Sequence, residues 1–93
     1  MKIAEHTGAF AGDKDAAASI RDEYIKPTLE NGKDILLDFE GVDLATQSFI
    51  HALIAAVVRE KSENLDHISF KNCNENVQSL IEIVVEYAQD EFE

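Results

Sequence analysis

The pattern of hydrophobic and polar positions changes between Ile35 and Val58, where a short apolar block is followed by a long one. Residues 35–39 are short enough for one strand, and their consecutive apolar positions predict a strand that is covered on both faces. A helix is predicted from about 48 to 60–63, because this stretch is apolar almost all round and such helices lie inside layered structures. The polar residues Thr46, Gln47 and Ser48 separate the two elements.

A first long helix is predicted from Lys14 to about Asn31. Asp13 is its candidate N-cap, and Gly32 is its stop, because Gly reaches the left-handed conformation that a C-cap needs. Pro27 lacks an amide hydrogen and clashes with the preceding turn, so we expect a kink or a break near Lys26. The inner face of this helix is expected to hold Ala17, Ile20, Tyr24 and Leu29.

The two ends of the chain complete the pattern. Residues 2–6 are expected to form a short edge strand, and residues 7–12, with two glycines, a flexible loop. Residues 67–71 predict a third strand, and the Asn-containing loop 72–74 offers caps for a last helix over about 75–90. One face of that helix carries Val77, Leu80, Ile81, Val84 and Ala88.

This order of elements predicts the fold class. Strands that alternate with helices form a mostly parallel sheet flanked by helices, here in the order β-α-β-α-β-α. Ninety-three residues are enough for one modest core, so we expect a single domain over residues 1–93. Four apolar residues of the last segment lie off its core stripe: Ile83, Val85, Tyr87 and Phe92. They indicate either a wide core helix or a surface for a partner or a second copy, and so a candidate homodimer.

Charge narrows the classes of partner. Eight Lys and Arg against nineteen Asp and Glu give a formal net charge of -11, which argues against nucleic acid and against an anionic membrane surface. Either the acidic surface serves solubility or it meets a basic partner. The chain shows no secretory signal and no apolar run of the ~20 residues that a membrane span requires. With its single Cys73, it is expected in the reducing cytoplasm.

No catalytic constellation is apparent. His6, His51 and His67 are scattered over separate predicted elements, and none pairs with a Ser or Cys at a recognisable spacing. Asp38 is expected to bond loop amides, and Asp43 to be solvated. Gly41 stands alone where a phosphate loop would need several glycines. Cys73 is expected to be an inert thiol, and no zinc spacing exists. We therefore expect no enzyme activity, no metal and no cofactor.

The stretch "ILLDFEGVDLATQSFIHALI" resembles the central motif of the STAS domain, which sulfate transporters and anti-sigma-factor antagonists share. It is more similar still to short STAS-like domains of small bacterial proteins. Gly12, Arg21 and Gly32 upstream, and "HISFKNCNENVQSLIEIV" downstream, also fit the pattern, so the resemblance covers about residues 8–86. It implies a small sheet flanked by helices.

The resemblance also implies a role for Ser48. In the antagonists a partner kinase phosphorylates a Ser at the start of the helix after the strand, and Ser48 occupies that place by register. The antagonists have Gly-Leu after this Ser and Asp two residues before it, where this chain has Phe49-Ile50 and Thr46. Phe49 either obstructs a kinase or buries itself and leaves Ser48 accessible. The alternative is that Thr46 or Ser48 only caps the helix.

These observations predict a non-catalytic regulatory or scaffolding domain that binds another protein, with a kinase-like ATPase as the candidate partner. The candidate phosphorylation or partner-binding residues are Asp43, Thr46, Gln47 and Ser48, together with the exposed face of the second helix. One alternative is a structural or oligomerisation module that uses the last helix. Another is a small-ligand-binding domain.

Overall fold

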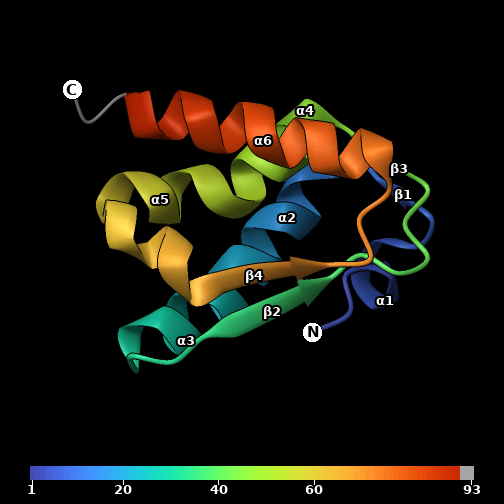
Figure 1. Ribbon diagram of the computed structural model, residues 1–93. Coiled ribbons are helices and arrows are strands. Elements are labelled where there is room, and N and C mark those ends of the chain that lie inside the picture. Colours follow the sequence, from blue (N-terminus) through green and yellow to red (C-terminus); the bar gives the residue numbers. More distant parts are fainter. Residues whose placement is uncertain (91–93) are drawn as a thin grey trace.

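The computed structural model of the protein describes residues 1–90, and Phe92 lies outside this part of the chain (Figure 1). Strand β2 (Ile35–Asp38) pairs in parallel with β4 (Ile68–Lys71). A second parallel pair joins β1 (Phe10–Ala11) to β3 (Leu44–Ala45). Helices pack against these small sheets, so the protein has the α/β fold class that the order of elements predicts.

The expected strand over residues 2–6 is wrong. Only Lys2 forms a parallel bridge, to Asp38, and the chain then turns into helix α1 (Ala4–Thr7). Ile3 is fully buried, whereas Glu5 and His6 are exposed. A strand with one buried face would bury residue 5 as well as residue 3, so this segment does not have the burial pattern of a strand. Strand β1 instead lies within residues 7–12, which the glycines had marked as a loop.

The first long helix continues past Pro27, so the break that was one of the two outcomes expected near Lys26 does not occur, and a π-helical stretch precedes the proline. The helix consists of α2 (Lys14–Ile20), the π-helical stretch η1 (Arg21–Ile25) and α3 (Lys26–Glu30). The Asp13 carboxylate caps its start by accepting hydrogen bonds from the amides of Asp15 and Ala16, as expected. Gly32, with φ of +70°, follows its end.

The π-helical stretch changes which side chains of this helix reach the core. A π turn takes in more residues than an α turn, so it shifts the inward face along the sequence. Ala17 and Ile20 are buried as expected, but the next buried residue is Ile25, and Tyr24 is 41% exposed. The inward position of Tyr24 was therefore a wrong prediction, because it assumed an α-helical period throughout.

The second long helix is largely as predicted. It runs through α4 (Gln47–Ile50), the π-helical η2 (His51–Ala55) and α5 (Ala56–Glu60), and half of its side chains are buried. The short 3-10 helix η3 (Ser62–His67) leads to β4, and α6 (Glu75–Asp90) ends the described chain. The core formed by these elements includes Ile3, Leu37, Phe39, Phe49, Leu53, Ile54, Val58, Val77 and Val84.

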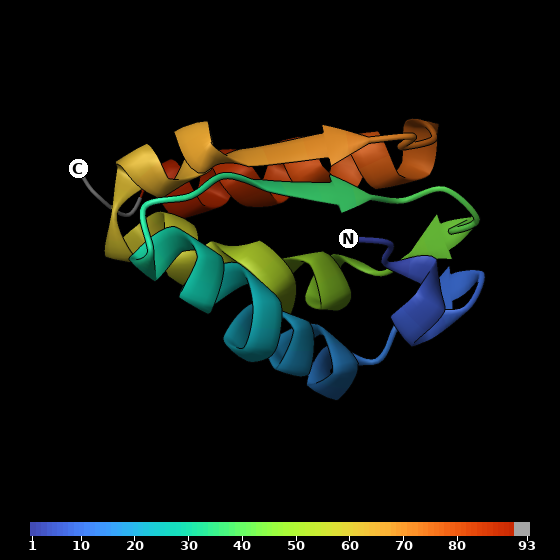
Figure 2. The same cartoon turned by 90° about the horizontal axis from the view of Figure 1, so that it is seen from below.

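Strand β2 is covered on one face, not on both. Burial alternates along it: Ile35 and Leu37 are buried, while Leu36 is 43% exposed. Ser69, which pairs with Leu36 on β4, is exposed as well. Figure 2 shows the reason, since α2–α3 and α4–α5 lie on the same side of the two strands. Among residues 1–90, no helix is long and apolar enough to cross a membrane.

Candidate functional site

The turn between β3 and α4 begins with a helix cap. Thr46 has an extended backbone, and its hydroxyl oxygen accepts a hydrogen bond from the Phe49 amide at 3.1 Å. This contact satisfies one of the amides that the first turn of a helix leaves without a partner. Of the two hydroxyls considered for the cap, Thr46 is therefore the one that fills this role.

Ser48 is left exposed by this arrangement. Its hydroxyl oxygen lies 3.3 Å from that of Thr46, and the neighbouring Gln47 is also exposed. The large side chain of Phe49 is fully buried, so it packs into the core and does not cover Ser48. Of the two alternatives for Phe49, the structure has the one that keeps the serine accessible.

Backbone and side-chain contacts fix the position of this turn. The Thr46 amide donates to the Ala11 carbonyl at 3.0 Å, which extends the pairing of β1 with β3. From α6, the Asn76 side-chain oxygen accepts a hydrogen bond from the Ala45 amide at 3.0 Å. The loop before β3 is held by Asn74, whose side-chain amide donates to the Asp43 carbonyl at 2.8 Å.

Asn74 also caps α6, because its side-chain oxygen accepts a hydrogen bond from the Val77 amide at 3.0 Å. The sequence predicted this capping role for the Asn-containing loop. It did not indicate that Asn74 and Asn76 would also reach the turn more than thirty positions earlier. The Asp43 side chain is exposed, as expected.

Two shallow hollows flank the exposed side of α4. One, of about 410 Å³, is lined by Lys14, Gln47, Ser48, His51 and Ala52. The other, of about 370 Å³, is lined by Gln47, His51, Val84 and Tyr87. Together they form a continuous surface that runs from the start of α2 across α4 to α6. We call this surface the α4 surface; it is lined by Lys14, Gln47, Ser48, His51, Ala52, Val84 and Tyr87.

Large apolar side chains are exposed on the β1–β3 pair and on α6. Phe10 and Leu44 are register partners in the β1–β3 pair and are 60% and 55% exposed. The Phe10 ring lies over Gly12, and a Cβ added there would come within 2.5 Å of it, so this exposed ring would have to shift. On α6, Ile83 and Tyr87 are 49% and 59% exposed. Of the residues predicted off the core stripe, Val85 is partly buried against the core.

His51 contacts Arg59 about two turns further along the helix. Arg59 Nη2 lies 3.2 Å from His51 Nε2. A guanidinium group only donates hydrogen bonds, so His51 Nε2 is the acceptor in this contact. His51 is half-buried and lines both hollows.

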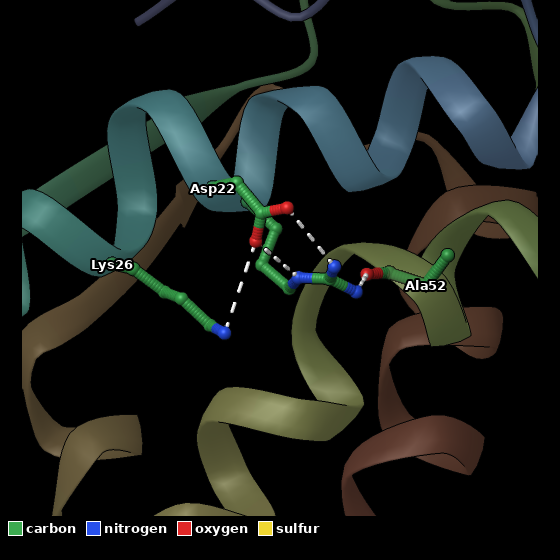
Figure 3. A network of polar contacts seen from close by, with 4 residues as sticks. Asp22, Lys26 and Ala52 are labelled. Atoms are coloured by element: carbon green, nitrogen blue, oxygen red, sulfur yellow. Dashed lines mark hydrogen bonds and ion pairs between the residues drawn. The ribbon is translucent and has the colours of Figure 1, made fainter.

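Arg21 links the two long helices through the carbonyl of Ala52, which Figure 3 shows together with Asp22 and Lys26. Its guanidinium donates to the Ala52 carbonyl, in the π-helical stretch η2, at 3.1 Å, and to Asp22 at 3.0 Å. Lys26 lies 3.8 Å from the same Asp22 carboxylate. The hydrogen bond from Arg21 holds the pKa of Asp22 below its usual value. The family resemblance had marked Arg21 only as a matching position, and its partner became clear from the structure.

The remaining candidate residues have structural roles. Asp38 accepts hydrogen bonds from the Glu40 amide at 2.9 Å and the Asn72 side chain at 3.0 Å, as expected of a residue that bonds a loop. These two bonds lower the pKa of Asp38. Burial raises the pKa of the Cys73 thiol, and the nearby Asp38 charge acts in the same direction, so the thiolate is disfavoured.

The other two histidines lie on separate elements. His67 contacts Asp34 at 2.6 Å, and the His6 ring packs edge-on against Tyr24. Neither of them lines the α4 surface. Within residues 1–90, no group of three or more His, Cys, Asp or Glu side chains is arranged to hold a metal ion.

Comparison with known proteins places the chain in a family. No curated protein and no solved structure matches it. A family model described as "STAS-like domain of unknown function (DUF4325)" matches residues 16–78, more than half of the chain. The matched segment contains Arg21, the β2 strand and the turn at Thr46–Ser48, and it lies within the region of resemblance found from the sequence. The chain therefore belongs to the family of STAS-like domains of unknown function.

Proposed function

We propose that the protein is a non-catalytic regulatory or scaffolding domain that binds another protein through the α4 surface. One observation carries this proposal: Thr46 provides the helix cap while Ser48, two residues later, stays exposed. A serine that is not needed for the cap is free to be read or modified. The contact of His51 with Arg59, instead of with a nucleophile, supports a recognition role over a catalytic one.

The chemistry around Ser48 suits phosphorylation. A phosphoserine carries about -1.5 to -2 charges at neutral pH. Lys14 and His51 line the same hollow as Ser48, so a cation and a hydrogen-bonding ring lie close to the added phosphate. The free amides at the start of the long helix also favour an anion there. On a chain of net charge -11, this hollow is therefore a place where a further negative charge is tolerated.

The partner that we propose is a kinase-like ATPase in the cytoplasm, by analogy with the antagonists that the chain resembles. In that model the partner both binds the α4 surface and phosphorylates Ser48. The added charge then changes affinity directly, because Ser48 and Gln47 lie in the contact surface itself. In this proposal the exposed Phe10 and Leu44 of the β1–β3 pair, which precedes α4, supply apolar area for the same contact.

The test begins with affinity purification from the native host and identification of the proteins that copurify. The affinity of the identified partner is then measured for wild type, Ser48→Ala, Ser48→Asp and the control Ser62→Asp. Ser62 is an exposed serine in η3, beyond the far end of the long helix, so its substitution adds the same charge elsewhere. We expect Ser48→Asp to change the affinity about tenfold or more, which is about 1.4 kcal/mol. Equal affinities for all four proteins would contradict the proposal.

A second candidate function rests on α6. Ile83 and Tyr87 lie one turn apart on this helix and are both about half exposed, which favours an oligomerisation surface. Sedimentation of wild type, Ile83→Glu and the control Gln78→Glu distinguishes the two functions. A wild-type dimer that only Ile83→Glu dissociates supports the oligomerisation module, and a monomer at all concentrations rules it out.

A further inference from the structure

Strand β4 has an unpaired edge. β2 runs along one side of β4, and within the described residues no strand pairs with its other side (Figure 1). An edge of this kind presents a row of backbone donors and acceptors that another extended segment can pair with. It shares no residue with the hollows of the α4 surface, so it is a separate candidate site.

The register identifies which backbone groups point outward. The Lys71 carbonyl accepts a hydrogen bond from the Phe39 amide, on the β2 side of the strand. Backbone groups of successive residues in a strand point to opposite sides, so Ser69 and Lys71 face β2 and Phe70 faces away from it. The amide and the carbonyl of Phe70 are therefore the central pair of groups on the open edge.

A groove accompanies this edge. It has a volume of about 410 Å³ and lies between the end of β4 and the first half of α6. Phe70 and Ile81 provide apolar lining, while Gln78 and Glu82 provide polar groups from the helix. Phe70 is partly exposed, so its ring is available for further contact. A strand edge beside a helix, with an apolar lining between them, suits an added strand that inserts one side chain into the groove.

We propose that the groove between β4 and α6 binds an extended, cationic peptide segment of a partner protein as an additional strand along β4. The outward amide and carbonyl of Phe70 specify a peptide backbone, and the lining by Phe70 and Ile81 specifies an apolar side chain. The charged side chain in this lining is Glu82, and the net charge of the chain is -11. Both favour Lys or Arg in the peptide on either side of its apolar residue. The same charge opposes a second copy of this chain as the occupant.

The experiment selects peptides from a random library displayed on phage against the wild-type protein. Affinities of the selected peptides are then measured for wild type, Glu82→Lys and Glu86→Lys. Both substitutions make the same charge change on exposed positions of α6, but only Glu82 lines the groove. We expect an apolar residue flanked by Lys or Arg in the selected peptides, and a loss of affinity of at least tenfold for Glu82→Lys alone.

Amide hydrogen exchange locates the bound peptide. The Phe70 amide is expected to exchange quickly in the free protein and at least tenfold more slowly with peptide bound. The Ser69 amide, which faces β2, is the internal control and stays protected in both states. A library without binders, equal losses for Glu82→Lys and Glu86→Lys, or an unchanged Phe70 exchange rate would each overturn the proposal. A peptide-free dimer with a protected Phe70 amide would assign the edge to a second copy and overturn it as well.

Discussion

The β2–β4 pair and the β1–β3 pair are both parallel, but different groups stabilise them. In β2–β4, Ile35, Leu37 and Ile68 are buried against the helices. In β1–β3 the larger side chains, Phe10 and Leu44, are more than half exposed, and the buried residues of the two strands are the small Ala11 and Ala45. The first pair therefore contributes apolar burial, and the second contributes little of it.

Polar contacts take the place of apolar burial in the β1–β3 region. The Asn76 side chain accepts a hydrogen bond from the Ala45 amide, and the Asn74 side chain donates one to the Asp43 carbonyl. The Ala11 carbonyl accepts a hydrogen bond from the Thr46 amide. Hydrogen bonds have directions, whereas apolar burial does not. The difference teaches that β2–β4 mainly holds the fold together, while β1–β3 mainly fixes the position of the turn that exposes Ser48.

The largest expected effect separates the two pairs by stability. Leu37→Ala should lower the free energy of unfolding by about 2–5 kcal/mol, because it removes buried methyl groups and leaves a cavity. Leu44→Ala, the same substitution in the exposed pair, should change it by less than about 0.5 kcal/mol. Urea denaturation of both variants measures this, and equal losses would contradict the comparison.

Next in size is the effect of removing Asn74. Asn74→Ala should cost about 0.5–2 kcal/mol, because the Val77 amide loses its cap and the Asp43 carbonyl loses its donor. Asn74→Asp keeps an acceptor for Val77 but has no amide to donate to Asp43. We expect the thermal midpoint of Asn74→Asp to lie close to that of wild type. The amide chemical shifts over residues 42–46 should still change as they do in Asn74→Ala. A midpoint as low as that of Asn74→Ala would argue against the capping role.

Within the turn itself, the two hydroxyls should behave differently. Thr46→Ala should lower the free energy of unfolding by about 0.5–2 kcal/mol through loss of the cap to Phe49. Ser48→Ala should stay within about 0.5 kcal/mol of wild type, because Ser48 is exposed. Thr46→Ser retains a hydroxyl and is the control for the lost methyl group. A larger loss of unfolding free energy for Ser48→Ala than for Thr46→Ala would show that Ser48, and not Thr46, caps the helix.

The smallest effect concerns pH and the end of β2. The bonds from Glu40 and Asn72 hold the pKa of Asp38 below its ordinary value of 3.8. A carboxylate whose pKa is lower in the folded protein than in the unfolded chain adds stability at pH values above its unfolded pKa. This stability is lost as the pH falls through its folded pKa. Asn72→Gly removes the side-chain donor and suits the positive φ of 58° at this position. The difference in thermal midpoint between wild type and Asn72→Gly should therefore narrow below pH 3.8, and a difference independent of pH would contradict this.

The main elements could be predicted from the sequence because their signals are local. The cap at Asp13 and the stop at Gly32 depend on neighbouring residues, and so do the apolar runs of β2 and of the second long helix. The turn at Thr46–Ser48 was found as a candidate site for the same reason, since a hydroxyl before an apolar helix is itself a local pattern.

Tertiary contacts decided the rest. The pairing of β1 with β3 joins two short segments more than thirty residues apart, and neither has a periodic pattern of its own. The π-helical stretch of the first helix, with Ile25 buried and Tyr24 exposed, was not predicted, because the prediction assumed an α-helical spacing of the buried residues throughout. Which of Thr46 and Ser48 caps α4 was likewise settled by the strand that positions Thr46. The sequence by itself determined the long helices, the strands β2 and β4, and the presence of a hydroxyl at the start of α4. The three-dimensional contacts determined the pairing of β1 with β3 and which hydroxyl remains exposed, because both depend on neighbours that are distant along the chain.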